Sequence, residues 1–281
     1  MNKSTFDEIR QLVYDHSGIT LGPTKMALVD ARIGKRLRVL NLPTPEAYVE
    51  FLKQRGNQEE FTHFIDVIST NVTSFFRESD HFDFMTDTVK NWAAQGQRKF
   101  RFWSAACSTG QEPYSMAITL LEALKGFTVD TKILATDIST EVLERCKQGI
   151  YREDKIDGVN TLQRQKFFNR AADPAGQSTE KFFQINDEVK RLVAFSRINL
   201  SSTPYPMKGP MDMIFVRNVM IYFDNELRAR ILSEAQRLLR PGGFLLVGHS
   251  EGLTGQITDL KLHSASIYTK PDERSASAMT G

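Results

Sequence analysis

The feature that most constrains the fold is a regular alternation of strand-like and helix-like segments that begins near Arg98. Apolar runs with strand character are expected at 99–107, 131–138, 192–200, 211–219, 244–250 and 266–270. Helical patterns separate them at 112–126, at 139–150 with Ser139 as the cap, and at 225–243 with its end at Pro241-Gly242-Gly243. Strands that alternate with helices predict a mostly parallel sheet wrapped by helices, so the fold class is α/β.

The first quarter of the chain has a different rhythm. Residues 1 to about 70 show helical periodicity and no strand pattern, and we expect four helices, at about 4–18, 24–40, 44–56 and 59–70. In the first helix, Ser4 or Thr5 is expected to cap the amino end and Gly18 to end the helix. A small all-helical domain therefore precedes the α/β domain.

These patterns divide the chain into a helical N-terminal domain (1–75), a linker and helix (76–97), a doubly wound α/β domain (98–270) and a flexible tail (271–281). Between about 151 and 195 the alternation lapses into turn-rich sequence with a β-like run at 181–185, which predicts a small β insertion. An insertion of this length in an α/β fold is more often functional than idle.

Composition excludes several classes of protein. The net charge of +2 is too small to say anything by itself about a nucleic-acid or membrane partner, so any such preference must come from local patches. Cys107 and Cys146 are too few for a disulfide framework in a chain of 281 residues. No stretch approaches the roughly 18 apolar residues of a membrane span. We therefore expect a soluble, cytoplasmic protein with no membrane insertion.

Three residues lie where an open parallel sheet binds its ligand, at the carboxyl ends of the strands. Gly110 follows the first strand, in a turn where a ligand can approach the backbone closely. Asp137 ends the next strand, where a carboxylate can accept two hydrogen bonds from a ribose diol. Glu112 would repel a pyrophosphate, and the turn lacks both common phosphate-binding patterns. S-adenosylmethionine, which carries a ribose diol, a sulfonium and an ammonium but no phosphate, fits these residues better than NAD or ATP.

Each of these residues also has a plainer explanation. Glu112 can complement the dipole of a helix, Asp137 can cap the following helix, and Gly110 can be an ordinary turn residue. Their combination favours the cofactor site. The sequence shows no Ser-His-Asp order and no metal-ligand cluster, so no metal is expected.

Several motifs follow one another in order: "NVTSFFR", "SAACSTGQEPYS", "ATDIS", "GIY", "INL", "IFVRNVMIYFD" and "LLRPGGFLLVGHSE". Together, from about residue 65 to 250, they resemble the CheR-type methyltransferases that act on bacterial chemoreceptors, and the helical first quarter is similar to that family's N-terminal domain. The resemblance implies transfer of a methyl group from S-adenosylmethionine, with S-adenosylhomocysteine as the product. It also implies that the substrates are glutamate side chains on the cytoplasmic helices of a methyl-accepting chemoreceptor.

The resemblance assigns site residues only at matching motif positions. It implies that Asn71, Thr73 and Arg77 contact the cofactor, with Glu112 at its amino acid end and Asp137 at its ribose. It places Asn199 and Leu200 at the adenine side, Asn218 and Val219 at the last cofactor contact, and Tyr222 near the transferred methyl. Arg77 and Tyr222 are thus the expected catalytic residues, although an isolated tyrosine is more often a half-buried core residue.

A basic helix is the expected substrate-docking element. Between residues 24 and 42 there are five basic residues, Lys25, Arg32, Lys35, Arg36 and Arg38, and one acidic residue. The spacing of Arg32, Lys35 and Arg36 places them on one helix face. Such a face is usually only solvated, but the resemblance favours docking of an acidic receptor helix.

Two other functions remain open alternatives at this point. An RNA methyltransferase would use the same basic helix, but no aromatic residues are interleaved for stacking on bases, so no nucleic acid is expected as partner. A cofactor-binding adaptor without activity would not need Arg77 and Tyr222.

We expect a monomer. Some members of the family bind a receptor's C-terminal peptide through the β insertion, and the sequence "RAADPAGQSTEKFF" at that place lacks their glycine-rich turn.

Overall fold

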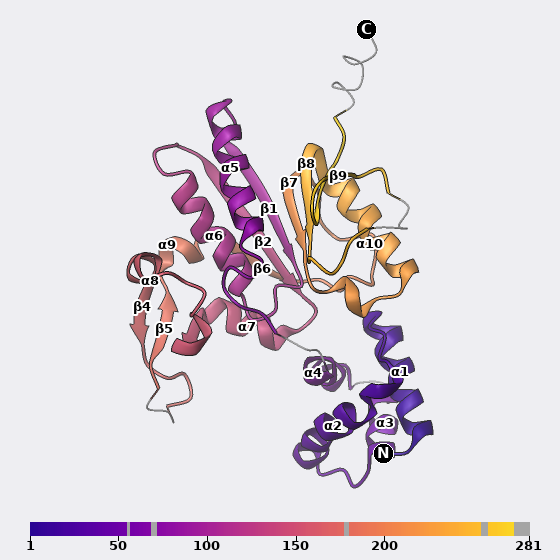
Figure 1. Cartoon of the computed structure of the whole chain (residues 1–281). Coiled ribbons are helices and arrows are strands. Elements are labelled where there is room, and N and C mark those ends of the chain that lie inside the picture. The colour runs from indigo at the N-terminus through magenta and orange to yellow at the C-terminus, as the bar shows by residue number, and fades with distance from the viewer. Residues whose placement is uncertain (55–56, 69–71, 177–179, 254–257, 273–281) are drawn as a thin grey trace.

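The computed structural model describes residues 1–54, 57–68, 72–176, 180–253 and 258–272. Its centre is a seven-stranded sheet in the order β6-β2-β1-β7-β8-β10-β9 (Figure 1). The strands are β1 (Lys99–Ala105), β2 (Asp130–Asp137), β6 (Val193–Arg197), β7 (Met211–Val216), β8 (Leu239–Val247), β9 (Lys261–Ser264) and β10 (Ile267–Thr269). Neighbours from β6 to β8 are parallel, and β10 and β9 are added antiparallel. The predicted α/β class is confirmed.

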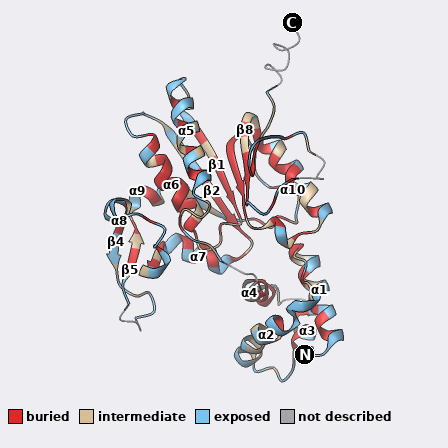
Figure 2. Cartoon of the chain, viewed as in Figure 1, coloured by how far each residue is buried: buried red, intermediate tan, exposed pale blue. Residues whose placement is uncertain are grey.

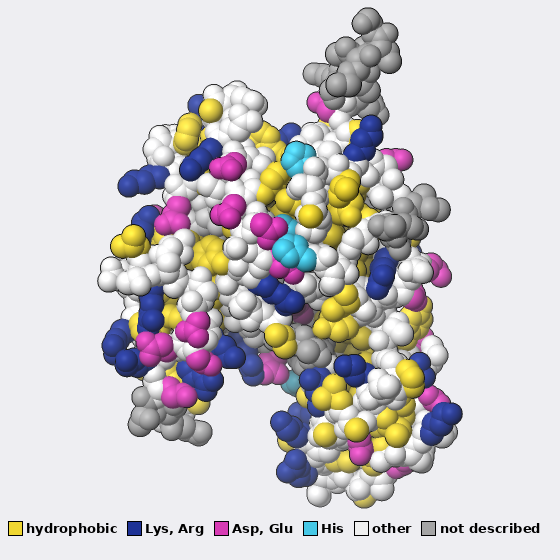
Figure 3. Space-filling view, in the orientation of Figure 1, with side chains coloured by type: hydrophobic (Ala, Val, Ile, Leu, Met, Phe, Trp, Pro, Cys, Tyr) yellow, Lys and Arg dark blue, Asp and Glu magenta, His cyan; other side chains and the backbone are white. Residues whose placement is uncertain are grey.

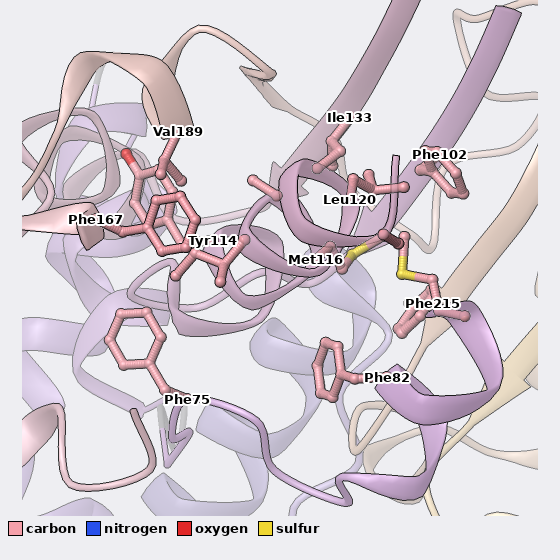
Figure 4. Close-up of a cluster of buried hydrophobic side chains, with 14 of the residues drawn as sticks. Phe75, Phe82, Phe102, Tyr114, Met116, Leu120, Ile133, Phe167, Val189 and Phe215 are labelled. Atoms are coloured by element: carbon pink, nitrogen blue, oxygen red, sulfur yellow. The ribbon is translucent and has the colours of Figure 1, made fainter. Parts of the chain in front are cut away.

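The central strands are buried on both faces because helices cover both. Phe102 and Phe215 pack against α5 (Asp80–Ala94) and α6 (Gln111–Ala123), and Figure 4 shows these rings close to Met116 and Phe82. Their neighbours in the same two strands, Trp103 and Ile214, point to the opposite face and pack under α10 (Asn225–Leu238). This alternation explains why the strands carry apolar residues on both faces and why Figure 2 shows most of their length as buried.

A second, smaller sheet confirms the predicted β insertion. Its three antiparallel strands lie in the order β3 (Ile150–Arg152), β5 (Phe182–Ile185) and β4 (Phe168–Ala171). It follows α7 (Thr140–Gln148), which the side chain of Ser139 caps as predicted, and contains the short helix α8 (Thr161–Phe167). The chain returns to the central sheet through α9 (Asp187–Lys190) at Val193, so the last three residues of the expected insertion belong to β6.

The helical domain consists of α1 (Lys3–Ser17), a short 3-10 turn (Pro23–Lys25), α2 (Met26–Leu40), α3 (Pro45–Lys53) and α4 (Gln58–Ile68) around a core of its own. Gly18 ends α1 as predicted, with φ 71°. The cap of α1 is Asn2, whose side chain accepts from the Thr5 amide, so the expected Ser4 or Thr5 cap was wrong. Ser4 and Thr5 lie inside the helix because Lys3 already has helical geometry.

The helical domain contacts the α/β domain through the end of α1 (Figure 1). The Tyr14 hydroxyl donates to Asp224 Oδ2 at 2.6 Å, and the Thr20 amide donates to the Tyr222 carbonyl at 2.8 Å. At Gly18, whose φ is 71°, a Cβ would lie 2.2 Å from Leu227 Cδ2, so a larger residue would strain the backbone and displace the Leu227 side chain. The helical domain is therefore fixed to the segment that contains Tyr222.

Two further expectations about elements were wrong. The helix at 225–243 ends at Leu238, because Leu239 already pairs with Met211 in the central sheet. The strand β9 was not expected, and all four of its residues are exposed, so it has no apolar pattern. Within the described part of the chain, no helix is both long and apolar enough to cross a lipid bilayer.

Candidate functional site

A cleft of about 1410 Å³, including space open to solvent, lies between the two domains at the carboxyl ends of β1, β2 and β7. This is the position where the strand order reverses and where open α/β sheets bind ligands. The cleft is lined by the predicted residues Thr73, Arg77, Glu112, Asp137, Asn199, Leu200, Asn218, Val219 and Tyr222. The structure thus brings these nine residues together, while Asn71 lies outside the described residues.

Asp137, at the end of β2, is held firmly in place. Its Oδ2 accepts from the Ser108 amide at 2.9 Å and its Oδ1 from the Ser139 amide at 3.0 Å. The side chain that caps α7 is Ser139, which accepts from the Val142 amide at 3.1 Å, so Asp137 is not the helix cap. The carboxylate is fixed at the cleft wall, where it can accept hydrogen bonds from a diol.

The turn between β1 and α6 has an unusual backbone. Ala106 and Ser108 both have positive φ, at 60° and 49°, and Gly110 has φ 95°. A Cβ on Gly110 would lie 2.8 Å from the Tyr151 hydroxyl and 3.0 Å from Cys146 Sγ. The glycine is therefore required by packing beneath the turn. Gly110 is not among the residues that line the cleft, contrary to the expectation that a ligand approaches the backbone there.

Glu112 belongs to a buried charge network that the sequence analysis did not find. Its Oε1 accepts from Ser104 Oγ at 2.7 Å, and its Oε2 pairs with Arg217 at 3.2 Å. The buried Arg217 guanidinium also pairs with Glu78 at 3.0 Å and donates to the Arg77 carbonyl. Burial raises the pKa of Glu112, and the charge of Arg217 and the bond from Ser104 oppose this shift. The available signals were the position of Arg217 at the end of an apolar strand and that of Glu78 directly after Arg77.

The segment with the two phenylalanines is anchored in the core of the α/β domain. Phe75 makes edge-on contacts with Tyr151 at 5.1 Å and Phe168 at 5.6 Å, and Figure 4 shows its ring directed into the apolar cluster. Phe76 contacts Phe82 at 5.3 Å, and its amide donates to Ser115 Oγ at 3.0 Å. These anchors leave Thr73 and Arg77 facing the cleft.

The backbone of this segment is strained at Phe76 and Glu78, with φ 52° and 55°. Arg77 lies between them and is partly exposed, and its guanidinium donates to the Val72 carbonyl at 3.0 Å. Such conformations are found where a structure must hold a side chain in a particular direction. Here they hold Arg77 at the cleft.

The segment after β7 is positioned by Glu251, another residue that the sequence analysis missed. Its carboxylate accepts from the amides of Asn218, Gly248 and Ile221, the last two at 2.9 and 3.1 Å. Asn218 has φ 56°, and a Cβ on Gly248 would lie 2.5 Å from the Asn218 side chain. The chain continues from Asn218 directly into a short 3-10 turn (Met220–Tyr222). The bonds to Glu251 therefore help to direct Tyr222 into the cleft.

Asn199 joins the cleft to the helical domain. Its Nδ2 donates to the His16 carbonyl at 2.6 Å, and its Oδ1 accepts from the Ser201 amide at 3.0 Å. The side-chain amide is therefore used within the protein. The role of Asn199 and Leu200 at the adenine side stays a prediction.

The basic residues of α2 differ in their surroundings. Arg32 lines the cleft and donates to the Ile68 carbonyl, whereas Lys35 and Arg38 are exposed. Arg36 pairs with the buried Glu60, whose carboxylate also accepts from Tyr48 at 2.7 Å. Arg36 therefore holds α2 against α4, and its expected place on an exposed docking face was wrong. Figure 3 shows Lys and Arg side chains at the edge of the helical domain, over α2.

Comparison with known proteins gives a consistent result. The family model described as "CheR methyltransferase, SAM binding domain" matches residues 71–269, and the one described as "CheR methyltransferase, all-alpha domain" matches residues 4–69. A chemotaxis protein methyltransferase of Salmonella typhimurium is 38% identical over 268 residues, which are 95% of this chain and 90% of the relative. Chemotaxis protein methyltransferase 2 of Pseudomonas aeruginosa is 39% identical over 250 residues, 89% of this chain and 86% of the relative.

Proposed function

The chain belongs to the CheR methyltransferase family, and we propose that it transfers the methyl group of S-adenosylmethionine to glutamate side chains on the cytoplasmic helices of a chemoreceptor. The observation that carries the proposal is the cleft between the domains, which Asp137 at the end of β2 and Glu112 in the first turn of α6 line together with Arg77 and Tyr222. The methyl esters formed in this way would serve adaptation in a chemosensory pathway.

The residues of the cleft fit this cofactor. The fixed carboxylate of Asp137 would accept from the ribose hydroxyls, and Glu112 would hold the ammonium of the amino acid end. An acidic wall suits a cofactor with two positive groups and would repel a pyrophosphate. Thr73 and Asn71 would contact the cofactor from the junction segment, Asn218 and Val219 from the segment after β7, and Asn199 and Leu200 from the adenine side.

When bound, S-adenosylmethionine supplies a methyl group on a positively charged sulfur, a good leaving group. The substrate glutamate has a pKa near 4.3 in water and is ionised at neutral pH, so no general base is needed. The carboxylate oxygen forms the new bond while the carbon–sulfur bond breaks and its electron pair stays on sulfur. Orientation in a site that excludes water can contribute roughly 7–11 kcal/mol to such a step.

Arg77 and Tyr222 would provide this orientation. The Arg77 guanidinium can hold the incoming carboxylate by a charge-assisted hydrogen bond, and Tyr222 brings a hydroxyl to the same cleft. Because too strong a bond to the carboxylate would stabilise the reactant as much as the transition state, both residues should position the substrate without tight binding.

The exposed Lys35 and Arg38 on α2 would dock the receptor, with Arg32 and Lys25 where the helical domain meets the cleft. Receptor methylation helices rich in glutamate would be attracted to this basic surface. The contribution is mainly steering, which salt screens with a Debye length of about 10 Å at 0.1 M.

The small sheet is the proposed place for a receptor C-terminal peptide. Its strand order leaves β4 at an edge, where an extended peptide can add as a further strand. Methyl transfer to a receptor fragment with and without its C-terminal peptide would test this, and equal rates would exclude the tether. We also propose that the enzyme acts as a monomer in the cytoplasm.

One experiment separates this function from the two alternatives. Equilibrium dialysis with labelled S-adenosylmethionine measures cofactor binding, and transfer of the label is then measured with a receptor fragment and with RNA. Binding followed by label in the receptor fragment supports the proposal. Label in RNA would point to a nucleic-acid methyltransferase, and binding without transfer to either would point to an adaptor.

A further inference from the structure

A cluster of three potential metal ligands lies behind the cofactor cleft and has no part in the proposed methyl transfer. It is formed by Glu78 and His81 at the start of α5 and by His249, just after β8. Each residue offers one ligand atom, and these atoms all lie within 4.8 Å of one another. The two sequence segments are far apart in the chain and meet only in the folded protein.

The ring of His81 is prepared to donate a lone pair into this cluster. His81 is completely buried, and its Nε2 lies 2.8 Å from Ser266 Oγ. The Ser266 hydroxyl donates its single proton to the Ala265 carbonyl at 2.6 Å, so His81 Nε2 must be the donor in the bond with Ser266. In a neutral imidazole this leaves Nδ1 as a bare acceptor, and His81 Nδ1 has no hydrogen-bond partner among the described residues.

His249 also has an arrangement that is typical of a metal-binding histidine. Its Nε2 lies 3.0 Å from Asp80 Oδ2, a carboxylate that can accept the Nε2 proton and leave Nδ1 as the ligand atom. His249 is exposed, so a cation can enter from solvent. Histidines that bind metals almost always donate their other ring proton in this way, which fixes the tautomer.

The third group, Glu78, brings the negative charge. Its Oε2 lies 3.8 Å from His81 Nδ1, close to the roughly 3.4 Å between two ligands of a tetrahedral zinc with bonds of about 2.1 Å. The distances from the His249 ligand atom to the other two would shorten by movement of the His249 ring, which is exposed. Arg217 pairs with Glu78, but it is shared with Glu112, so its charge does not neutralise Glu78 alone.

We propose that Glu78, His81 and His249 form a site for a divalent transition-metal ion of the zinc type, with water as a further ligand. Two imidazoles and one carboxylate suit Zn²⁺ and Co²⁺, while Mg²⁺ and Ca²⁺ prefer oxygen ligands. The ion links the start of α5 to the segment after β8. Because Glu78 also bonds Arg217 and Asn218, the ion fixes the residues that form the back of the cleft.

The test is direct metal binding by the full chain without an affinity tag, measured by calorimetry with Zn²⁺ and by the visible absorption of Co²⁺. His249→Ala should weaken Zn²⁺ binding by more than about 100-fold, because it removes a ligand. Asp80→Asn should weaken Zn²⁺ binding roughly 10- to 100-fold, because it changes only the partner of His249. Both positions are exposed, so these variants keep the fold, which melting without metal would verify.

Two matched variants serve as controls. His63→Ala removes an exposed histidine on α4, and Asp83→Asn makes the same charge change on the first turn of α5. Both should bind Zn²⁺ like the unchanged protein. Absence of saturable Zn²⁺ binding by the unchanged protein would overturn the proposal, as would binding that His249→Ala and Asp80→Asn leave unaltered. None of these readouts involves methyl transfer.

Discussion

Replacing Asp137 with alanine should nearly abolish cofactor binding while the protein stays folded. The carboxylate lies at the end of β2, where two backbone amides hold it at 2.9 and 3.0 Å in the wall of the cleft. One hydrogen bond to each ribose hydroxyl would be lost, and bonds to a charged group contribute about 1.5–3 kcal/mol each. The sum of about 3–6 kcal/mol corresponds to a rise in Kd of roughly 10²- to 10⁴-fold.

Calorimetry with S-adenosylhomocysteine would measure this loss without turnover. A matched control is Asp130→Ala, which removes the same side chain from the other end of the same strand. Asp130 is exposed and pairs with Arg101 at the surface, so this variant should bind the cofactor like the unchanged protein. An unchanged Kd in a folded Asp137→Ala variant would refute the assignment of Asp137 to the ribose.

The remaining predictions concern other parts of the cleft and the helical domain. Arg77→Ala should lower kcat with little change in melting temperature, since a partly exposed cleft arginine adds little to folding; a much lower melting temperature would show a structural role. Because burial raises the pKa of Glu112, cofactor affinity should decrease as the pH falls through this raised pKa and Glu112 loses its charge. Glu112→Gln should bind more weakly with a flatter pH profile, and an unaltered profile would contradict the role of Glu112. Reversal of Lys35 and Arg38 to Glu should raise KM for the receptor and flatten its salt dependence. In contrast, Arg36→Ala should destabilise the fold by about 3 kcal/mol, because the buried Glu60 loses its cationic partner and keeps only the bond from Tyr48. Equal receptor kinetics at low salt would show that Lys35 and Arg38 are only solvated.

The architecture could be predicted because its signals are local. Runs such as 99–107 and 211–219 carry apolar residues on both faces of the strand, since these strands are covered by helices on both faces. Gly18 and Ser139 were identified from turn and cap chemistry alone, and both have the expected role. The strand β9 had no such signal, because its residues are all exposed.

Where tertiary contacts override local signals, the sequence misled us. The Pro-Gly-Gly run after α10 is a good helix stop, but pairing of Leu239 with Met211 ends the helix earlier. Helical spacing placed Arg36 beside Arg32 and Lys35, yet it could not reveal that Glu60, 24 positions away, forms a buried pair with Arg36.

The site was predictable only in part. The cleft residues at strand ends, such as Asp137, follow from the sheet, whereas Arg77 and Tyr222 came from the resemblance to a family. The network around Arg217 could not be predicted from spacing, because Glu112 and Glu78 are 105 and 139 positions away from it in the chain. Convergence of such distant residues is a property of the folded protein.

This chain should form methyl esters on glutamate side chains of a chemoreceptor. To measure this, the protein is incubated with methyl-labelled S-adenosylmethionine and a receptor cytoplasmic fragment, and the product is then treated with mild alkali. An ester releases its label as volatile methanol, whereas N-methyl groups do not. We predict alkali-labile label in the fragment and none in a fragment whose methylation-site glutamates are replaced by glutamine. Label that resists alkali, or that enters both fragments equally, would contradict the account.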